Sequence, residues 1–497
     1  MKYISTRGSD SANGFKEVVL KGLAEDGGLF VPATYPKLDL ARLKGLEFAQ
    51  LAFEVINPFV DGDIAPETLK KILSDVYSPN VFNHPQIAPV QKLADGNYVL
   101  ELFHGPTLAF KDFALQLLGR LFQHFGQPIN IIGATSGDTG SAAIAGCAGL
   151  SNVNVFILHP KGKVSEVQRR QMTTILAPNV HNIALEGNFD DCQNIVKAIF
   201  EDVEFKRAHN LSAVNSINWA RIVAQVVYYF YVGLQFDEAL SYAVPTGNFG
   251  DILAGWIAHK MGLPINKLII ATNKNDILHR FIQTGVYKKE AVFATLSPSM
   301  DIQISSNFER LLFEYYGRDG AKIASKIANL KEQGQFAVED GVLADIRQIF
   351  ASSACDDANT SKTIAQTYKA SRYVADPHTA TGIFAANQFL SPHPNPNPLP
   401  QEGEGTFLPF AGGNLLSPLP QAGGNLLSPL PQAGGVGGGH AVVTLATAHP
   451  AKFAGAVKAA CGVEPALPLA LADLFERPEH FRTAPNSVDA IKNIIEK

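Results

Sequence analysis

The chain has 497 residues, of which 46% are hydrophobic and 18% are charged. A chain of this length exceeds what one compact core accommodates, so we expect two or more domains. The formal net charge of -5 at pH 7 excludes a dominant nucleic-acid-binding surface. The four cysteines form no CxxC pair and no zinc spacing, and we expect reduced thiols.

No apolar run reaches the roughly 18 residues of a membrane helix. The first residues also lack the apolar segment of a secretory signal. We therefore expect a cytoplasmic enzyme or binding protein, without a membrane or nucleic-acid partner.

Strand and helix patterns change along the chain. Residues 1–95 show mixed and helical patterns broken by Gly and Pro turns, and predict an N-terminal mixed domain. From residue 98 onward, β-rich runs alternate with helical patterns. The pairs are 98–103 with 104–126, 128–134 with 139–149, 152–160 with 164–175, and 240–247 with 251–262. This alternation predicts βαβ units around a mostly parallel sheet, whose sites lie beyond the carboxyl ends of the strands.

Residues 391–440 interrupt this alternation. They hold 10 of the 30 prolines and 11 of the 42 glycines, and AGGNLLSPLPQ occurs twice in tandem. Such a segment cannot bury enough apolar area to offset its ordering entropy, and it predicts a disordered surface insertion. A polyproline segment that binds a partner is the alternative. The α/β region then comprises 96–390 and 441–497, with a smaller mobile subdomain expected at about 130–235.

The helical pattern of residues 104–126 carries a charge on its apolar face. At about 100° per residue, Lys111 lies in line with Leu115, Leu118 and Phe122. One interpretation is a lysine that extends its ammonium group to solvent near a helix end. The other is a desolvated lysine, whose lowered pKa makes it nucleophilic enough to form a Schiff base.

Two segments, 129–146 and 242–255, share an apolar strand, a turn of small polar residues and a small-residue helix. The free N–H groups of such a turn and the helix dipole form an anion site. In the second segment, Gly247 and Gly250 let the backbone close around a phosphate. In the first, the residues that add hydroxyl donors are Thr135, Ser136 and Thr139.

A third cluster offers donors for a small phosphate or carboxylate, and consists of Asn215, Ser216, Asn218 and Arg221. Taken singly, each of these features is also explained by an ordinary capped turn or solvated loop. Together with Lys111 they suggest pyridoxal phosphate (PLP), whose aldehyde needs a lysine and whose phosphate needs a backbone cradle. The sequence lacks the motifs GK[ST], GxGxxG, HExxH and GxSxG, so we expect no P-loop, dinucleotide, metal or serine-hydrolase site.

Seven motifs occur in the order found in a known enzyme family. They are HGPTLAFKDFALQ at 104–116, GATSGDTGSAA at 133–143, NSINWARI at 215–222, VPTGNFGDILAG at 244–255, SPSMDIQISSNFERLLF at 297–313, DPHTATG at 376–382 and TAHPAKF at 447–453. The opening MKYISTRG and the segment GLAEDGGLFVP fit the same pattern. Over essentially the whole chain except 391–440, the sequence resembles threonine synthase, in the longer form found in bacteria and fungi.

The resemblance implies an α/β fold of the fold-type II PLP enzymes, similar to the tryptophan synthase β chain. Two open, twisted and mostly parallel sheets flanked by helices are expected beside the N-terminal mixed domain. The implied activity is that of a lyase in threonine biosynthesis. It converts O-phospho-L-homoserine and water to L-threonine and phosphate, by γ-elimination of phosphate and β-addition of water.

Residue by residue, the resemblance also implies a site. Lys111 is similar to the lysine that forms the imine with PLP, and Thr447 to the hydroxyl partner of the pyridine nitrogen. The residues similar to the loop around the cofactor phosphate are Gly247, Asn248, Phe249, Gly250 and Asp251. Those similar to the loop for the substrate carboxylate are Ser136, Gly137, Asp138 and Thr139. Those similar to the binders of the substrate phosphate are Asn215, Ser216, Asn218, Arg221 and Lys452. Asp138 is also implied to face the phenolic oxygen of PLP, although many fold-type II relatives have Asn there.

Other residues of the motifs have two interpretations. Ser305, Ser306 and Asn307 are expected to cap the helix that follows them, near the site but without a role in it. His378 and His449 either donate to a phosphate or stabilise turns.

Alternatives to an active threonine synthase are open at this point. One is another fold-type II enzyme, such as a threonine dehydratase or a cysteine synthase. A second is a protein that binds PLP or a phosphorylated ligand without turnover. A third is an enzyme damaged by the insertion beside the strand of Thr447, although loop-closure cost grows slowly with length. The oligomeric state, monomer or dimer, is open.

Overall fold

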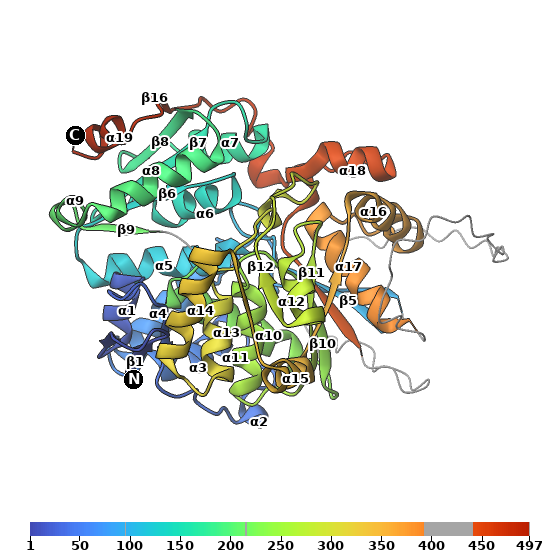
Figure 1. Ribbon diagram of the computed structural model, residues 1–497. Coiled ribbons are helices and arrows are strands. Elements are labelled where there is room, and N and C mark those ends of the chain that lie inside the picture. The colour runs from blue at the N-terminus through green and yellow to red at the C-terminus, as the bar shows by residue number, and fades with distance from the viewer. Residues whose placement is uncertain (95, 214–215, 392–440, 497) are drawn as a thin grey trace.

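The computed structural model describes residues 1–94, 96–213, 216–391 and 441–496 (Figure 1). Apart from Ser391, the predicted insertion lies outside the described residues. Asn215 of the predicted phosphate cluster also lies outside them. The disorder of the insertion and the role of Asn215 therefore stay predictions.

A six-stranded sheet with the order β14-β11-β10-β15-β5-β4 lies in the large lower part of Figure 1. Its strands are β4 Val90–Ala94, β5 Asn97–Glu101, β10 Leu240–Pro245, β11 Ile265–Thr272, β14 Phe350–Ala354 and β15 Val442–Ala446. Neighbouring strands pair in parallel, except that β4 runs antiparallel to β5. Strands β5, β10 and β15 are buried at every residue, as expected for parallel strands covered by helices on both faces.

A second sheet, at the upper left of Figure 1, has the order β16-β8-β7-β6-β9 and is parallel throughout. Its strands are β6 Ile129–Ala134, β7 Val153–Pro160, β8 Val180–Glu186, β9 Leu211–Ala213 and β16 Arg482–Pro485. On one face it has a core of its own, shared with α8 Phe189–Glu201 and α19 Val488–Ile495. The predicted fold of two mostly parallel sheets flanked by helices is confirmed.

Helices fill the remaining layers. Those of the first half are α1 Phe15–Lys21, α2 Leu40–Leu43, α3 Phe48–Val60, α4 Pro66–Val76, α5 Lys111–Phe125, α6 Asp138–Cys147, α7 Glu166–Thr173, α9 Val203–Ala208 and α10 Trp219–Gly233. Those of the second half are α11 Gly250–Lys260, α12 Ile277–Thr284, α13 Phe308–Tyr315, α14 Gly320–Gln333, α15 Asp340–Ile349, α16 Asp357–Ser371, α17 Pro377–Leu390 and α18 Ala454–Cys461. Short 3-10 turns lie at η1 Pro298–Met300, η2 Pro450–Phe453 and η3 Leu469–Leu471, and a hairpin pairs β12 Val286–Lys288 with β13 Gln335–Ala337.

Two boundaries differ from those expected from the sequence. The division at residue 95 falls inside the six-stranded sheet, because β4 precedes it and pairs with β5. The smaller sheet is not confined to about 130–235, because the C-terminal strand β16 pairs with β8. Hydrogen bonding between neighbouring strands decides the first boundary, and hydrogen bonding between strands distant in sequence decides the second.

The N-terminal elements share a core with the α/β region. They include an antiparallel sheet of β1 Tyr3–Ser5, β2 Ser11–Ala12 and β3 Phe30–Pro32, so the mixed character predicted for this part is confirmed. The rings of Tyr3 and Phe59 lie edge-on to Trp219, with centroids 6.1 and 5.7 Å away. One continuous hydrophobic cluster therefore joins the first 77 residues to α10.

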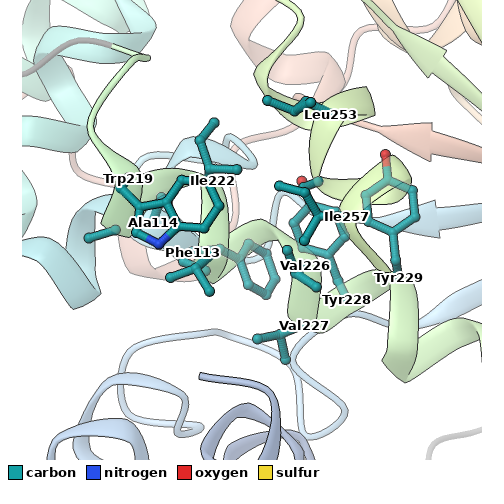
Figure 2. Packing of buried hydrophobic residues seen from close by; sticks show 14 of the residues in the cluster. Phe113, Ala114, Trp219, Ile222, Val226, Val227, Tyr228, Tyr229, Leu253 and Ile257 are labelled. Carbon is teal, nitrogen blue, oxygen red and sulfur yellow. The ribbon is translucent and has the colours of Figure 1, made fainter. Parts of the chain in front are cut away.

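Helix α10 lies at the centre of that cluster. It is buried on every side from Trp219 to Phe230, as expected for a helix that is apolar all round. Figure 2 shows its side chains packed with Phe113 of α5 and with Leu253 and Ile257 of α11. The core thus connects the starts of three helices that carry predicted site residues.

Helices α5 and α6 approach so closely that only glycine fits where they cross. A Cβ on Gly119 would overlap the carbonyl of Gly146, and a Cβ on Gly146 would overlap the carbonyl of Leu115. Each glycine lies about two turns after the first residue of its helix. Those first residues are Lys111 in α5 and Asp138 in α6, so the crossing holds them near each other.

All four cysteines are free, as the sequence predicted. Burial raises the pKa of the Cys147, Cys192 and Cys355 thiols to about 12, so these thiols stay protonated and unreactive near neutral pH. Within the described residues, no helix has both the length and the apolar character to span a bilayer.

We expect Gly146→Ala to lower the free energy of unfolding by about 1–3 kcal/mol, because the added methyl group meets rigid backbone. The control is Gly341→Ala in α15, where a Cβ meets open space and the higher helix propensity of Ala predicts no loss, with a gain of up to about 1 kcal/mol. Urea unfolding measures both values. Wild-type stability in Gly146→Ala would contradict the close crossing.

Candidate active site

The predicted site residues meet at the carboxyl ends of both sheets. Thr447 follows β15, the loop 246–249 follows β10, and Thr135 follows β6. The segment after β5 is tied to the segment after β15, because Phe110 N donates to Thr447 O at 2.9 Å and His449 N donates to Leu108 O at 3.0 Å. These bonds fix the start of α5 beside Thr447.

Lys111 is the first residue of α5 rather than an interior residue of one helix over 104–126. The helix begins there because residues 104–110 are held as a loop by the contacts with the segment after β15. The Lys111 side chain is 12% exposed, and its Nζ lies 3.4 Å from Asp138 Oδ2. Burial lowers the pKa of this ammonium, Asp138 opposes that shift, and Lys452 and Arg221 add to it. The structure therefore favours the desolvated lysine over the solvent-reaching one.

The Asp138 carboxylate is the most connected group of the site. Its Oδ1 lies 2.7 Å from Lys452 Nζ and accepts from Gln168 Nε2 at 2.8 Å, and its Oδ2 accepts from Ser299 Oγ at 3.0 Å. Although burial by itself raises the pKa of this carboxyl, Lys452 and Lys111 hold it well below its usual range. Asp138 is thus an anion at any working pH.

Lys452 is fully buried and already paired. Its Nζ donates to Thr107 O at 2.7 Å besides contacting Asp138. The sequence implied a binder of the substrate phosphate at this position. In the structure the ammonium group neutralises Asp138, so a phosphate has to compete with that carboxylate for it.

Arg221 lies in the first turn of α10 and is 4% exposed. Within the described part of the chain, its Nε and Nη1 have no acceptor. Burial lowers the pKa of the guanidinium to about 10, which leaves it charged near neutral pH. A buried cation with two unused donors is costly unless an anion binds to it, so Arg221 marks an anion site.

The loop before α11 has the form of a backbone cradle. Phe249 has φ 63°, in the left-handed region, and is the residue before the helix. A Cβ on Gly247 would lie 3.0 Å from Ser299 O, so this position is confined. The free N–H groups at the start of α11 suit a phosphate.

Two side chains of that loop point into the protein core. The carboxylate of Asp251 accepts from Tyr228 at 2.6 Å and from Tyr229 at 3.0 Å, and burial raises its pKa to about 6. The ring of Phe249 packs against Phe308 and Phe350. At both positions only the backbone can contact a phosphate, because the side chains belong to the core.

Asn218 does not fit the predicted role of phosphate binder. Its Oδ1 accepts from Ala220 N at 3.0 Å, its Nδ2 donates to Val19 O at 2.9 Å, and the side chain is fully buried. It caps α10 and orients Arg221 indirectly. Thr135 is similar, since its hydroxyl accepts from the N–H groups of Gly137 and Gly140, both at 2.9 Å.

The expected capping role of residues 305–307 is wrong. Asn307 is the residue before α13, but its side chain makes no capping hydrogen bond. Instead these side chains contact the loops that hold Asn248 and Ser216. Tertiary contacts outcompete the local cap here.

His378 and His449 act structurally. His378 Nδ1 lies 2.9 Å from Asp376 Oδ1, and its Nε2 accepts from Ser299 N at 3.2 Å. His449 Nδ1 accepts from Ala451 N at 3.1 Å, and burial lowers the pKa of this imidazole to about 4. These contacts are hydrogen bonds within the protein.

Sequence reasoning missed the contacts that three residues make in the site, although it had placed Asn307 near the site. Gln168 and Ser299 hold Asp138, and Asn307 holds the two loops. For Ser299 and Asn307 the only signal was membership of the motif 297–313. Gln168 carried no signal, because a glutamine in the helix of 164–175 has no distinctive chemistry until it meets Asp138.

The arrangement fits PLP. Lys111 is a buried lysine with a lowered pKa, next to the residue whose N–H is bonded to Thr447 O, and a backbone cradle lies at 247–250. The unpaired guanidinium of Arg221 is a candidate for a second anion site. Among the described residues, no group of His, Cys, Asp and Glu side chains has the geometry of a metal site.

Comparison with known proteins agrees with this geometry. Family models match residues 2–77 (threonine synthase N terminus), 91–347 (pyridoxal-phosphate dependent enzyme) and 434–495 (threonine synthase, C-terminal). The chain is 49% identical over 506 aligned positions to threonine synthase of Pseudomonas aeruginosa, covering 100% of this chain and 98% of that one. The chain belongs to the threonine synthase family. It is a PLP-dependent enzyme of fold type II.

Two solved structures of the threonine synthase family are similar over the whole chain. One is PLP-bound threonine synthase from Brucella melitensis, with 44% identity and a TM-score of 0.87 over 100% of this chain and 98% of that one. The other is yeast threonine synthase, with 38% identity and a TM-score of 0.86 over the same shares. Neighbours at this identity support the fold over the whole chain.

Arg221→Met and Arg310→Met form a matched pair of tests on ligand-free protein. Arg310 is equally buried but donates to Phe30 O, Asn307 Oδ1 and Ile217 O at 3.0, 2.5 and 2.6 Å. Removing the unpaired charge of Arg221 is expected to stabilise the protein by about 1–3 kcal/mol. Removing Arg310 is expected to destabilise it by about 3 kcal/mol or more, since its acceptors lose their donor. Urea unfolding decides, and a loss in both variants would refute the unpaired state of Arg221.

Proposed function

We propose that this enzyme converts O-phospho-L-homoserine and water to L-threonine and phosphate. The observation that carries the proposal is the unpaired, buried guanidinium of Arg221. Arg221 lies on α10, whereas the cradle at 247–250 precedes α11, and we assign the guanidinium to a second phosphate, that of the substrate. A threonine dehydratase or a cysteine synthase has no phosphorylated substrate that would need this site.

We assign the site residues from the resemblance, and the contacts described above support the assignment. Lys111 binds PLP, Thr447 faces the pyridine nitrogen, and Asp138 faces the phenolic oxygen. The cofactor phosphate lies on the backbone of Gly247, Asn248, Phe249, Gly250 and Asp251. The substrate carboxylate is received by Ser136, Gly137 and Thr139, and the substrate phosphate by Ser216, Arg221 and Lys452.

PLP, when bound, withdraws electrons from the carbon that bears the substrate amine. Lys111 then holds and moves protons at Cα, Cβ and Cγ, because its lowered pKa makes the neutral amine accessible. The phosphate leaves from Cγ with the electrons of the C–O bond, and Arg221 holds the released dianion. Water adds its oxygen at Cβ and gives up one proton, which completes threonine.

Asp138 restrains Lys111 in this scheme. Its carboxylate contacts Lys111 Nζ and Lys452 Nζ on different oxygens, so it holds both ammonium groups without a free charge of its own. Because Gln168 and Ser299 also donate to it, the carboxylate keeps one orientation. Lys111 thus returns to one position between proton transfers.

The cellular location belongs to the same proposal. Free, unreactive thiols suit a reducing compartment, and we place the enzyme in the cytoplasm.

The predicted mobile subdomain corresponds to the five-stranded sheet with its separate core. Its movement would close the site against water, because Asp138 on this unit contacts Lys452 and Ser299 on the other.

The decisive assay incubates purified holoenzyme with O-phospho-L-homoserine and measures phosphate and threonine. Wild type is expected to form both in equal amounts, and Lys111→Ala to form neither and to lose the absorbance of lysine-bound PLP. Arg221→Met is expected to keep that absorbance but lose about a hundredfold in kcat/KM, since it removes charged hydrogen bonds to phosphate. Lys458→Ala is the control, because this lysine is 59% exposed and pairs with Glu464.

Equal rates in wild type and Lys111→Ala, or no product from either, would reject the proposed activity. If neither protein forms product but wild type shows the absorbance of lysine-bound PLP and Lys111→Ala does not, the protein binds the cofactor without turnover.

A further inference from the structure

Asn307 joins two loops that are far apart in the sequence. Its Nδ2 donates to Asn248 O at 3.1 Å and to Ser216 O at 3.0 Å. Its backbone N–H donates to Asn248 O as well, at 3.1 Å. The first loop is the cradle before α11, and the second leads into α10 and Arg221. A single amide therefore spans the two anion sites of the enzyme.

Arg310 fixes the orientation of this amide. Arg310 Nη1 donates to Asn307 Oδ1 at 2.5 Å, and a guanidinium has no acceptor atom, so Oδ1 and not Nδ2 faces it. The same guanidinium donates to Ile217 O at 2.6 Å and to Phe30 O at 3.0 Å. Asn307 is itself fully buried. The Nδ2 group is thereby committed to the two loop carbonyls.

Because the peptide bond is planar, these contacts also fix the direction of the N–H groups in the cradle. In a trans peptide the C=O and the next N–H point in opposite directions. Since Asn307 draws Asn248 O to its side, the N–H of Phe249 faces the other side. Ser305 Oγ donates to Gly247 O, which turns the N–H of Asn248 the same way. The donors of the cradle are therefore aimed by residues behind it.

A similar restraint acts on the second loop. The carbonyl of Ser216 is held by Asn307, and its hydroxyl lies 3.2 Å from Ser306 Oγ. Helix α10 starts three residues later, with Arg221 in its first turn. The contact at Ser216 thus fixes where the segment that carries Arg221 begins, relative to the cradle.

We propose that Asn307 is a positioning residue that sets the separation of the cradle 247–250 from the segment 216–221. It thereby governs the affinity for the PLP phosphate and for a second phosphate together. The inference rests on the proposed function only for the identity of the second ligand. Binding of PLP and of inorganic phosphate can be measured without turnover.

The test is Asn307→Asp, which keeps an oxygen for Arg310 and replaces Nδ2 by an oxygen that faces two carbonyl oxygens. We expect the Kd of the apoenzyme for PLP to rise about tenfold or more. The Kd of the PLP-loaded enzyme for inorganic phosphate should rise by a similar factor. Absorbance titration measures the first value and calorimetry the second.

Asn179→Asp is the matched control. Asn179 is buried and also donates from Nδ2 to backbone carbonyls, to Cys147 O at 2.8 Å and Val153 O at 2.7 Å. It contacts the end of α6 opposite to Asp138. It should therefore lower thermal stability without changing either Kd. Arg221→Met should weaken phosphate alone, which separates one site from the other.

Two results would overturn the proposal. They are unchanged Kd values in Asn307→Asp, and an equal weakening in Asn179→Asp. A rise in only one of the two Kd values of Asn307→Asp would also overturn it, since the shared link would be absent. Should N307D not fold, Ser306→Ala tests the same connection, because its hydroxyl contacts Ser216 Oγ and, at 3.4 Å, Asn248 Oδ1. Both Kd values should then rise by a smaller factor, and unchanged values would reject the link.

Discussion

The Asp138 carboxylate lies buried between Lys452 Nζ at 2.7 Å and Lys111 Nζ at 3.4 Å, and the site depends on this balance of charge. Arg221 also acts on Lys111, so the cluster of Asp138, Lys111, Lys452 and Arg221 contains three cationic side chains and one anionic side chain. Burying such a surplus is costly. Burial lowers the pKa of Lys111, and Lys452 and Arg221 add to that shift. Arg221 Nε and Nη1 have no acceptor among the described residues. The surplus makes the site a receptor for anions, and anionic ligands relieve its cost.

The distances in this cluster are set by packing rather than by the charges themselves. Lys111 and Asp138 are the first residues of α5 and α6, and the two helices cross at Gly119 and Gly146 with backbone against backbone. A close-packed crossing of this kind keeps the first residues of the two helices at a fixed separation. The lysine is thereby presented to a cofactor in one orientation, which an exposed lysine on a mobile loop would not achieve.

The N-terminal part contributes to the site without touching its ligands. Phe30 on β3 accepts from Arg310, which in turn holds Asn307 between the two anion loops. Trp219, the first residue of α10, packs against Tyr3 and Phe59. Loss of these contacts would therefore reach Arg221 and the cradle through the packed core. This explains physically why the first 77 residues belong to the enzyme and share its core.

The amino-acid sequence by itself determined the alternation of strands and helices around a mostly parallel sheet, because periodicity acts locally. It also indicated Lys111 and the turn at 247–250 as candidate site residues, whereas the second sheet followed from the resemblance to the family. The order of motifs determined the family. Only the tertiary structure decided that β4 and β16 join the sheets, that Asn218 and Asp251 turn into the protein, and that Lys452 pairs with Asp138. It also decided the contacts of Asn307, which the sequence presented as a helix cap. For the side chains the physical reason is shared: a polar group selects its partner from all groups within about 3 Å, and most of those groups are distant in sequence. For β16 the partner strand β8 is likewise distant in sequence.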